Sequence, residues 1–178
     1  MLATASNILF VVAFILGWLI RDVGAADRAM QSRVSLHLLM GLGTLVAASL
    51  VHALVLTYFM GTGRWMEETG RVYRLAEDIR GQNQSLKYKT LPGMGLCLLL
   101  LIVTGATGAA ADPASPVVFR GWFGVSGGTI HFLLATATFV ANGIVNLLEF
   151  NSIRQNRELV ETMLGEVRRI RTERGLPV

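Results

Sequence analysis

Two stretches of eighteen residues, HLLMGLGTLVAASLVHAL (37–54) and HFLLATATFVANGIVNLL (131–148), decide the fold of this chain. Both are apolar, both begin with a histidine, and at an offset of 94 residues they share seven identities. Polar residues are rare in such apolar segments, so the matched histidines and threonines are the most informative identities. The pattern predicts two similar helices that arose by internal duplication, each with a histidine at the same depth. The identical pairs are His37/His131, Leu39/Leu133, Thr44/Thr138, Val46/Val140, Ala47/Ala141, Val51/Val145 and Leu54/Leu148.

The composition places these helices in a membrane. Apolar residues make up 52% of the chain and the mean hydropathy is positive, so the chain is more apolar than an ordinary soluble domain. A helix that crosses a bilayer core of ~30 Å needs about 20 apolar residues, and four stretches qualify or nearly do. We therefore expect an all-α integral membrane protein, a four-helix bundle built from two similar helical hairpins. The predicted spans are about 6–21, 35–60, 91–111 and 127–149.

The first span also has one feature of a signal peptide. Residues 23–26 (VGAA) offer a cleavage site of small residues. However, no Lys or Arg precedes the apolar run, and Arg21 and Asp22 lie where a cleavage region is usually uncharged. We therefore expect a helix that is retained.

Each predicted hairpin is followed by a segment with the periodicity of an amphipathic helix. These segments are residues 67–81 and 160–175, where apolar side chains recur at three- and four-residue spacing. The predicted organisation is a first half, residues 1–84, and a second half, residues 85–178, each with a hairpin and a cytoplasmic helix. The apolar positions are Trp65, Val72, Ala76 and Ile79 in the central segment and Val160, Met163, Val167 and Ile170 in the tail.

Glycine and proline mark the expected boundaries. Gly61 and Gly63 suit the end of the second span. Residues 81–85 have the polar composition of a linker between the halves, and Pro92 suits the first turn of the third span.

Positive charge sets the expected orientation. Residues 61–90 and the tail after residue 150 each carry six Lys or Arg residues, whereas the other two connections carry three and one. The positive-inside rule then places both termini and the central connection in the cytoplasm, with the chain integral to a bacterial cytoplasmic (inner) membrane. The basic pI follows from these segments, so we expect no nucleic-acid partner. The lone Cys97 excludes an intramolecular disulfide and any Cys-rich metal site.

Polar residues within the second and fourth spans fall on single helix faces. At ~100° per residue, positions separated by about 4, 7, 11, 15 and 18 residues return to nearly the same face. Because lipid offers polar groups no partners, both stripes should face the bundle interior and each other. The stripes are His37, Gly41, Thr44, Ala48, His52 and Val55 in the second span, and His131, Ala135, Thr138, Asn142, Asn146 and Glu149 in the fourth.

The paired histidines resemble those of b-type cytochromes, such as the cytochrome b of quinol–cytochrome c reductases, where haem lies between imidazoles from two parallel helices of a four-helix bundle. The resemblance implies that His37 and His131 are the axial ligands of one haem b, which transfers electrons and does not bind oxygen. A neutral imidazole suits this role because one nitrogen holds iron while a hydrogen-bond acceptor orients the other. This chain has three histidines, enough for one such pair. The residues expected beside the porphyrin are Gly41, Thr44, Ala135 and Thr138.

The deeper polar residues have two interpretations. They form either an interhelical hydrogen-bond ladder or a proton-linked or quinone-binding site on the inner side. In the same way, the small residues on the stripes are typical of close helix packing. The deeper residues are His52, Asn142, Asn146 and Glu149.

Two functions fit these patterns equally well. The first is a membrane-embedded electron-transfer or anchor subunit with one bis-histidine haem between the second and fourth spans. The second is a non-catalytic structural or assembly subunit whose cytoplasmic tail binds a partner. A small channel or transporter lined by the stripes is a third, less favoured hypothesis. The sequence shows no catalytic constellation, so the expected partners are the lipid bilayer and either other subunits of a membrane complex or further copies of the chain.

Overall fold

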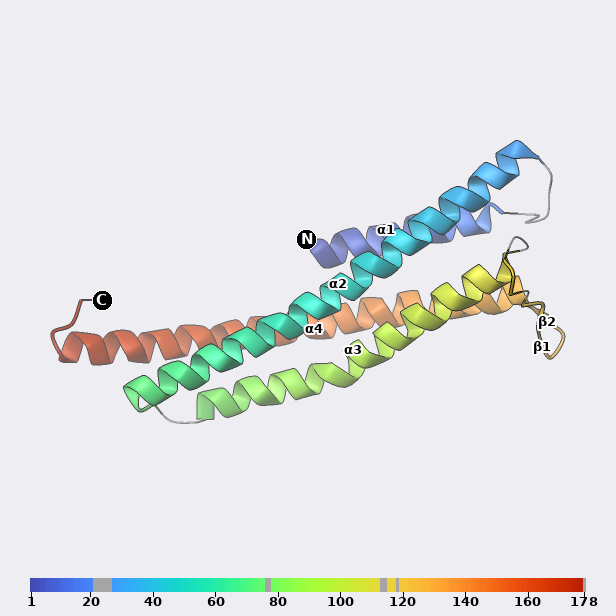
Figure 1. Ribbon diagram of the computed structural model, residues 1–178. Helices are drawn as coiled ribbons and strands as arrows, with labels where there is room; N and C mark the ends of the chain where they lie inside the picture. Colours follow the sequence, from blue (N-terminus) through green and yellow to red (C-terminus); the bar gives the residue numbers. More distant parts are fainter. Residues whose placement is uncertain (21–26, 76–77, 113–114, 118, 178) are drawn as a thin grey trace. The chain divides into compact units, whose positions relative to one another are not determined.

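The chain folds into helices joined by short connections (Figure 1). The computed structural model describes residues 1–20, 27–75, 78–112, 115–117 and 119–177. The small-residue stretch 23–26, the alternative cleavage site, lies outside the described residues.

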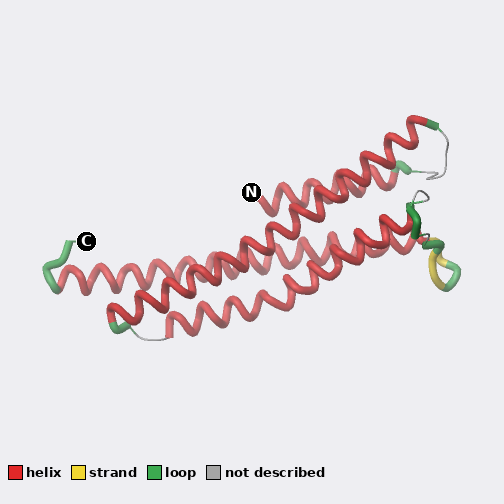
Figure 2. The backbone as a smooth tube through the Cα atoms, in the orientation of Figure 1, coloured by secondary structure: helices red, strands yellow, loops and turns green. Residues whose placement is uncertain are grey.

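Within the described residues the secondary structure is helical apart from one two-stranded hairpin, which confirms the all-α fold class (Figure 2). Helices α2, α3 and α4 are each long and apolar enough to cross a membrane, whereas α1 is apolar but has only 17 residues. The chain therefore has the long apolar helices of a membrane-associated protein. The elements are α1 (Leu2–Trp18), α2 (Arg28–Tyr73), α3 (Asp78–Ala111), β1 (Gly121–Trp122), β2 (Val125–Ser126) and α4 (Gly127–Glu173).

Helices α2 and α4 continue past the predicted ends of their spans. They have 46 and 47 residues, which is about 70 Å each at 1.5 Å per residue. The two segments are largely helical, as expected, but the prediction that they form separate short helices was wrong. Residues 160–173 continue α4, residues 67–73 end α2, and residues 78–81 begin α3. After α2, Arg74 takes a left-handed conformation with φ 56°, and the Leu75 N–H donates to the Gly70 carbonyl at 3.0 Å. This hydrogen bond closes the last turn and ends the helix.

Helix α3 contains two features that were predicted to lie outside it. Residues 81–85 are helical and not a linker, and Pro92 lies well inside the helix and not in its first turn. Proline removes one main-chain hydrogen bond from a helix. The neighbouring Gly93 lies against Val145 of α4, where an added Cβ would be 3.2 Å from a valine methyl group. Tertiary packing therefore holds α3 continuous at a position where the local sequence signal favours a boundary.

The chain forms two compact units, each assembled from segments that are distant in the sequence. Helices α2, α3 and α4 contribute residues to both units. The predicted division into two sequence halves rests on the repeat and stays a prediction. Unit 1 consists of Met1–His52 and Gly95–Ile144, and unit 2 of Ala53–Met94 and Val145–Val178.

In unit 1, α1 and α3 each contact both α2 and α4. The core contains Phe10 of α1, Ala48 of α2 and Leu101 of α3. Leu45 and Phe139 pack against this core from α2 and α4. Four helical segments thus share one apolar interior.

In unit 2, a closed ring of hydrogen bonds joins α2, α3 and α4. Asn83 Nδ2 donates to Asn156 Oδ1 at 2.7 Å and to Thr62 Oγ1 at 3.1 Å. Asn156 Nδ2 donates to the same hydroxyl at 3.0 Å. Gly63 makes room for this ring, because Asn83 Oδ1 lies 2.5 Å from the position of an added Cβ. The sequence predicted that Gly63 suits the end of a helix. Instead, α2 continues to Tyr73 and Gly63 serves helix packing.

The apolar stripe of the tail faces the protein in unit 2. Met163 is fully buried, and Val160, Val167 and Ile170 are partly buried, as expected from their spacing. In the central segment Trp65 and Ile79 are partly buried, but Val72 is 72% exposed, and Ala76 lies outside the described residues. The prediction of one helix face through these positions was wrong, because α2 ends at Tyr73 and Ile79 belongs to α3.

Removing one amide of the unit 2 ring should destabilise the protein. In Asn156→Ala the buried Asn83 amide loses an acceptor, so we expect the free energy of unfolding to fall by about 1–3 kcal/mol. Asn151 is exposed on the same helix, and Asn151→Ala should change this free energy by less than about 0.5 kcal/mol. Unfolding in detergent micelles, followed by circular dichroism, measures both. Equal effects of the two variants would contradict a stabilising ring.

Candidate functional site

His37 is held between α2 and α1 in unit 1. Its Nδ1 lies 2.9 Å from the carbonyl oxygen of Ala13. Gly17, one turn further along α1, lies against the ring: an added Cβ would be 2.8 Å from His37 Cε1. A side chain at position 17 would displace the imidazole, so the carbonyl and the glycine together fix the ring.

His131 is held in the same way between α4 and α3. Its Nδ1 lies 3.2 Å from the carbonyl oxygen of Thr104. An added Cβ at Gly108 would be 2.7 Å from His131 Cε1. The two histidine environments thus have the same construction, and the supporting positions on α1 and α3 are related by an offset of 91 residues. This offset also relates three pairs of buried positions in the two helices: Ser6/Cys97, Phe10/Leu101 and Ala13/Thr104.

The structure brings the two imidazoles together. Their ring centroids are 6.1 Å apart, and the ring planes make an angle of 76°. Each Nδ1 faces a carbonyl oxygen, so in the neutral ring Nδ1 carries the proton and Nε2 keeps its lone pair. Neither Nε2 has a hydrogen-bond partner among the described residues. The half-buried pair of His37 and His131 therefore offers two unprotonated ring nitrogens close together.

Polar contacts further along α2 and α4 show that these helices run in the same direction in unit 1. His52 Nε2 donates to Asn142 Oδ1 at 3.1 Å, and Asn142 Nδ2 donates to Asn7 Oδ1 of α1 at 3.0 Å. His52 and Asn142 are 1% and 0% exposed. Because His37 meets His131 and His52 meets Asn142, the polar stripes face each other in unit 1, as the sequence predicts.

Two other residues of the predicted inner site belong to unit 2. Asn146 and Glu149 are buried in that unit. The structure joins His52 with Asn142 in unit 1, and a quinone-binding site formed by all four residues stays a prediction.

The residues expected beside a porphyrin lie one and two turns from the histidines. Gly41 and Ala135 are half buried, and a Cβ added to Gly41 meets no atom within 4 Å, so this turn has open space beside it. Thr44 donates at 2.7 Å to a carbonyl one turn earlier in its own helix. The fully buried Thr138 shares a 2.6 Å hydrogen bond with the Thr104 hydroxyl. Thr104 thus contacts the fourth helix twice, through its carbonyl at His131 and through its hydroxyl at Thr138.

Sequence reasoning missed the residues on α1 and α3 that hold the histidines. A main-chain carbonyl accepts a hydrogen bond whatever its side chain is, so Ala13 and Thr104 leave no signal. Gly17 and Gly108 leave a weak one, since they are identical residues at matching positions of two otherwise different helices.

The donor set fits a metal in a porphyrin better than a metal bound by protein alone. Protein metal sites generally use three or four ligands. Among the described residues, no group of three or more His, Cys, Asp or Glu side chains has such an arrangement. A porphyrin supplies the equatorial ligands itself, so two axial imidazoles are sufficient.

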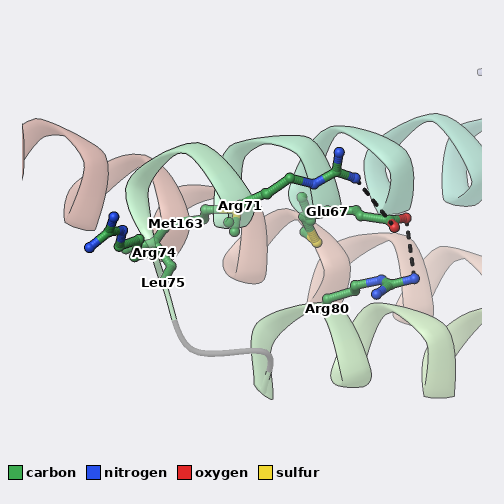
Figure 3. Close-up of a pocket in the computed structure, with 8 residues that line it drawn as sticks. Glu67, Arg71, Arg74, Leu75, Arg80 and Met163 are labelled. Carbon is green, nitrogen blue, oxygen red and sulfur yellow. Dashed lines mark ion pairs between the residues drawn. The ribbon is translucent and has the colours of Figure 1, made fainter.

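Unit 2 contains a separate cavity of about 320 Å³ at the ends of α2 and α3. Figure 3 shows Glu67 paired with Arg71 at 3.9 Å and with Arg80 at 3.2 Å. Met66 and Met163 also line the cavity. The paired side chains are 39–76% exposed, so these ion pairs contribute little to stability. The residues that line this cavity include none of the predicted site residues.

Comparison with protein-family models finds no match, and comparison with curated proteins and with solved structures finds none either. The His37–His131 pair is therefore interpreted from its own geometry.

The glycines that contact the histidines should be intolerant of substitution. In Gly17→Ala and Gly108→Ala the new methyl group would overlap an imidazole, so we expect the free energy of unfolding to fall by about 1–3 kcal/mol. Gly43 of α2 and Gly143 of α4 also belong to unit 1, but an added Cβ at either position would meet open space. Gly43→Ala and Gly143→Ala should be neutral or stabilising, by up to about 1 kcal/mol. Unfolding in micelles compares the four variants, and a uniform response would exclude a special role for the first pair.

Proposed function

We propose that the chain is a membrane-embedded electron-transfer or anchor subunit that holds one haem b between α2 and α4 in unit 1. The observation that carries this proposal is the matched pair of imidazoles, each bound through Nδ1 to a carbonyl of the preceding helix. Haem iron with both axial positions filled by histidine transfers electrons and leaves no position for oxygen.

The proximity of the two rings supports this proposal. Their centroids are 6.1 Å apart in an edge-to-face arrangement, so both imidazoles would be available to one metal ion bound between them. The hydrogen bond from Nδ1 to a carbonyl also fixes the tautomer and raises the basicity of Nε2 as a ligand.

Each residue of the site has a defined part in this proposal. Haem supplies the one-electron chemistry. His37 and His131 would hold the iron, while the carbonyls of Ala13 and Thr104 orient their rings. The porphyrin would lie against residues one and two turns from the ligands: Gly41, Thr44, Ala135 and Thr138.

The proposed setting is a transmembrane four-helix bundle of two similar hairpins, related by a pseudo-twofold axis along the membrane normal. Two repeat offsets support it: 94 residues between α2 and α4, and 91 residues between α1 and α3. In this arrangement α1 also crosses the membrane, which makes four spans together with α2, α3 and α4. Its 17 residues extend about 26 Å, close to the ~30 Å of a bilayer core.

The proposed location is the cytoplasmic membrane of a bacterium, with both termini in the cytoplasm and the histidine pair in the outer half of the bilayer. The basic segments of unit 2 support this orientation. Other subunits of a membrane complex or further copies of the chain are the proposed protein partners. A quinone is the candidate redox partner, because the His52 imidazole and the Asn142 amide form a buried polar group in unit 1.

A structural or assembly subunit is the second candidate function. The bonds His52–Asn142 and Thr104–Thr138 join helices without any cofactor. Hydrogen bonds of this kind stabilise membrane helix pairs by about 0.6 kcal/mol on average.

An absorption spectrum distinguishes the two functions. Protein purified from cells supplied with haem should show a reduced b-type spectrum. His37→Ala and His131→Ala should each abolish the bis-histidine signal, because a single imidazole leaves the iron with an open axial position. His52→Ala is the matched control and should largely retain the signal, since His52 bonds Asn142 and is not part of the ring pair.

Two outcomes would contradict the haem proposal. One is a colourless protein that is well folded by circular dichroism. The other is a haem spectrum that survives both His37→Ala and His131→Ala. Either outcome would leave the structural subunit as the better account.

Cysteine labelling tests the proposed orientation. Cys97 is buried, and Cys97→Ser gives a background without thiols. In that background, intact cells exposed to an impermeant reagent should leave Gly165→Cys in the tail unmodified and should modify Val117→Cys, which is 67% exposed at the other end of the helices. The reversed pattern would invert the topology.

A further inference from the structure

The connection between α3 and α4 carries a rigid hairpin with exposed aromatic side chains. Strands β1 and β2 pair antiparallel, with Gly121 opposite Ser126 and Trp122 opposite Val125. Phe123 and Gly124 form the turn, with φ values of 51° and 78°. Positive φ at both positions defines a type I′ turn, in which asparagine, aspartate or glycine is the usual first residue.

Phe123 is unusual at this position in two ways. A bulky side chain with positive φ is a conformational outlier, and the Phe123 side chain is fully exposed, so it is not buried against any described residue that would compensate for the strain. Trp122 beside it is 67% exposed, although one part of its ring contacts Phe119 at a centroid distance of 5.3 Å. A strained backbone that presents two aromatic rings outward indicates a surface that binds something.

The hairpin is fixed in place and does not depend on a partner for its shape. An added Cβ at Gly121 would overlap the Val125 carbonyl oxygen, so only glycine fits there. At the end of β2, Ser126 Oγ accepts a hydrogen bond from the Thr129 N–H at 3.2 Å, which caps the start of α4. The aromatic tip therefore has a defined position relative to the first turn of α4.

The position of the hairpin along the chain identifies its binding partner. It joins α4 without a spacer, and the exposed apolar surface of α4 begins with Phe132 and Leu133, which are 37% and 57% exposed. Phe132 lies five residues after Gly127, the first residue of α4, which is about 7.5 Å along the helix axis. The aromatic tip thus continues the apolar surface of a helix that is long enough to cross a membrane. Exposed Arg120 beside the hairpin adds a positive charge that suits lipid phosphate.

We propose that the hairpin of residues 121–126 is an anchor for the lipid interface, where Trp122 and Phe123 insert at the boundary between head groups and acyl chains. The strained turn holds Phe123 away from the protein, where it enters the lipid. Anchoring at this point fixes the depth of the first turns of α4. The proposal requires that α4 spans a membrane and is independent of haem.

Trp122 itself reports on insertion. In a full-length variant with Trp18→Phe and Trp65→Phe, reconstituted in phosphatidylcholine–phosphatidylglycerol nanodiscs, Trp122 is the single indole. We expect its fluorescence to be quenched by phosphatidylcholine brominated near the top of the acyl chains and to be protected from aqueous acrylamide. Strong acrylamide quenching without lipid quenching would overturn the proposal. That result is expected if the hairpin binds another protein and not lipid.

Phe123→Asn separates anchoring from folding. Asparagine is favoured at this position of a type I′ turn, so the hairpin should form at least as well, while lipid quenching of Trp122 should fall about twofold or more. The control Val117→Asn changes an exposed apolar residue of the same connection and should leave the quenching unchanged. Equal quenching in Phe123→Asn and the parent would overturn the proposal.

A spin label provides an independent measurement that keeps the native tryptophans. In Cys97→Ser, Phe123→Cys, a nitroxide should be more accessible to oxygen than to a water-soluble nickel chelate, as at Leu133→Cys. Accessibility like that of Gly165→Cys in the tail would overturn the proposal.

Discussion

A polar side chain that is buried without a hydrogen-bond partner is costly, and this constraint determines how the helices of unit 1 meet. His52 and Asn142 are almost completely buried, and each finds its partner on another helix. His37 and His131 satisfy the same requirement through the main-chain carbonyls of Ala13 and Thr104. A carbonyl oxygen has two lone pairs, so a helical carbonyl can accept a side-chain N–H beside its main-chain bond. The Thr104 carbonyl also accepts from the Thr107 hydroxyl at 3.1 Å. The polar positions thus set the rotation of α2 and α4 about their axes.

In unit 1 the pattern of buried positions is repeated more closely than the amino-acid sequence is. Three buried positions of α1 correspond to buried positions of α3 at an offset of 91 residues, although none of these pairs is identical. At the same offset the partly buried Gly17 and Gly108 are identical. Phe10 of α1 and its counterpart Leu101 of α3, for example, share one core with Ala48 of α2. The interior therefore accommodates different apolar shapes at equivalent places, whereas the two glycines have no substitute where an imidazole lies against the helix.

The sequence predicted the helical class and the two polar stripes that face each other. Both follow from periodicity and from the cost of leaving buried polar groups without partners. It failed where tertiary contacts override local signals. Pro92 favours a helix boundary but lies inside α3, and Gly63 favours an end but makes room for Asn83. The carbonyl acceptors of the histidines could not be predicted at all, because any residue provides a carbonyl. The proximity of His37 and His131 was thus predictable from the sequence, whereas the groups that orient their rings were not.

The similarity of the two histidine environments is more specific than helix packing requires. Further along the stripes the repeat partners differ: Ala48 corresponds to Asn142, and His52 to Asn146. Packing tolerates this, since a polar group can find its partner on any neighbouring helix, as Asn142 does. At His37 and His131 the ring, its carbonyl acceptor and the glycine beside it all recur, and the ring centroids are 6.1 Å apart. A ligand bound between the rings would contact both halves at once and would preserve the same geometry in each. The recurrence therefore supports the proposal of a shared cofactor at this pair.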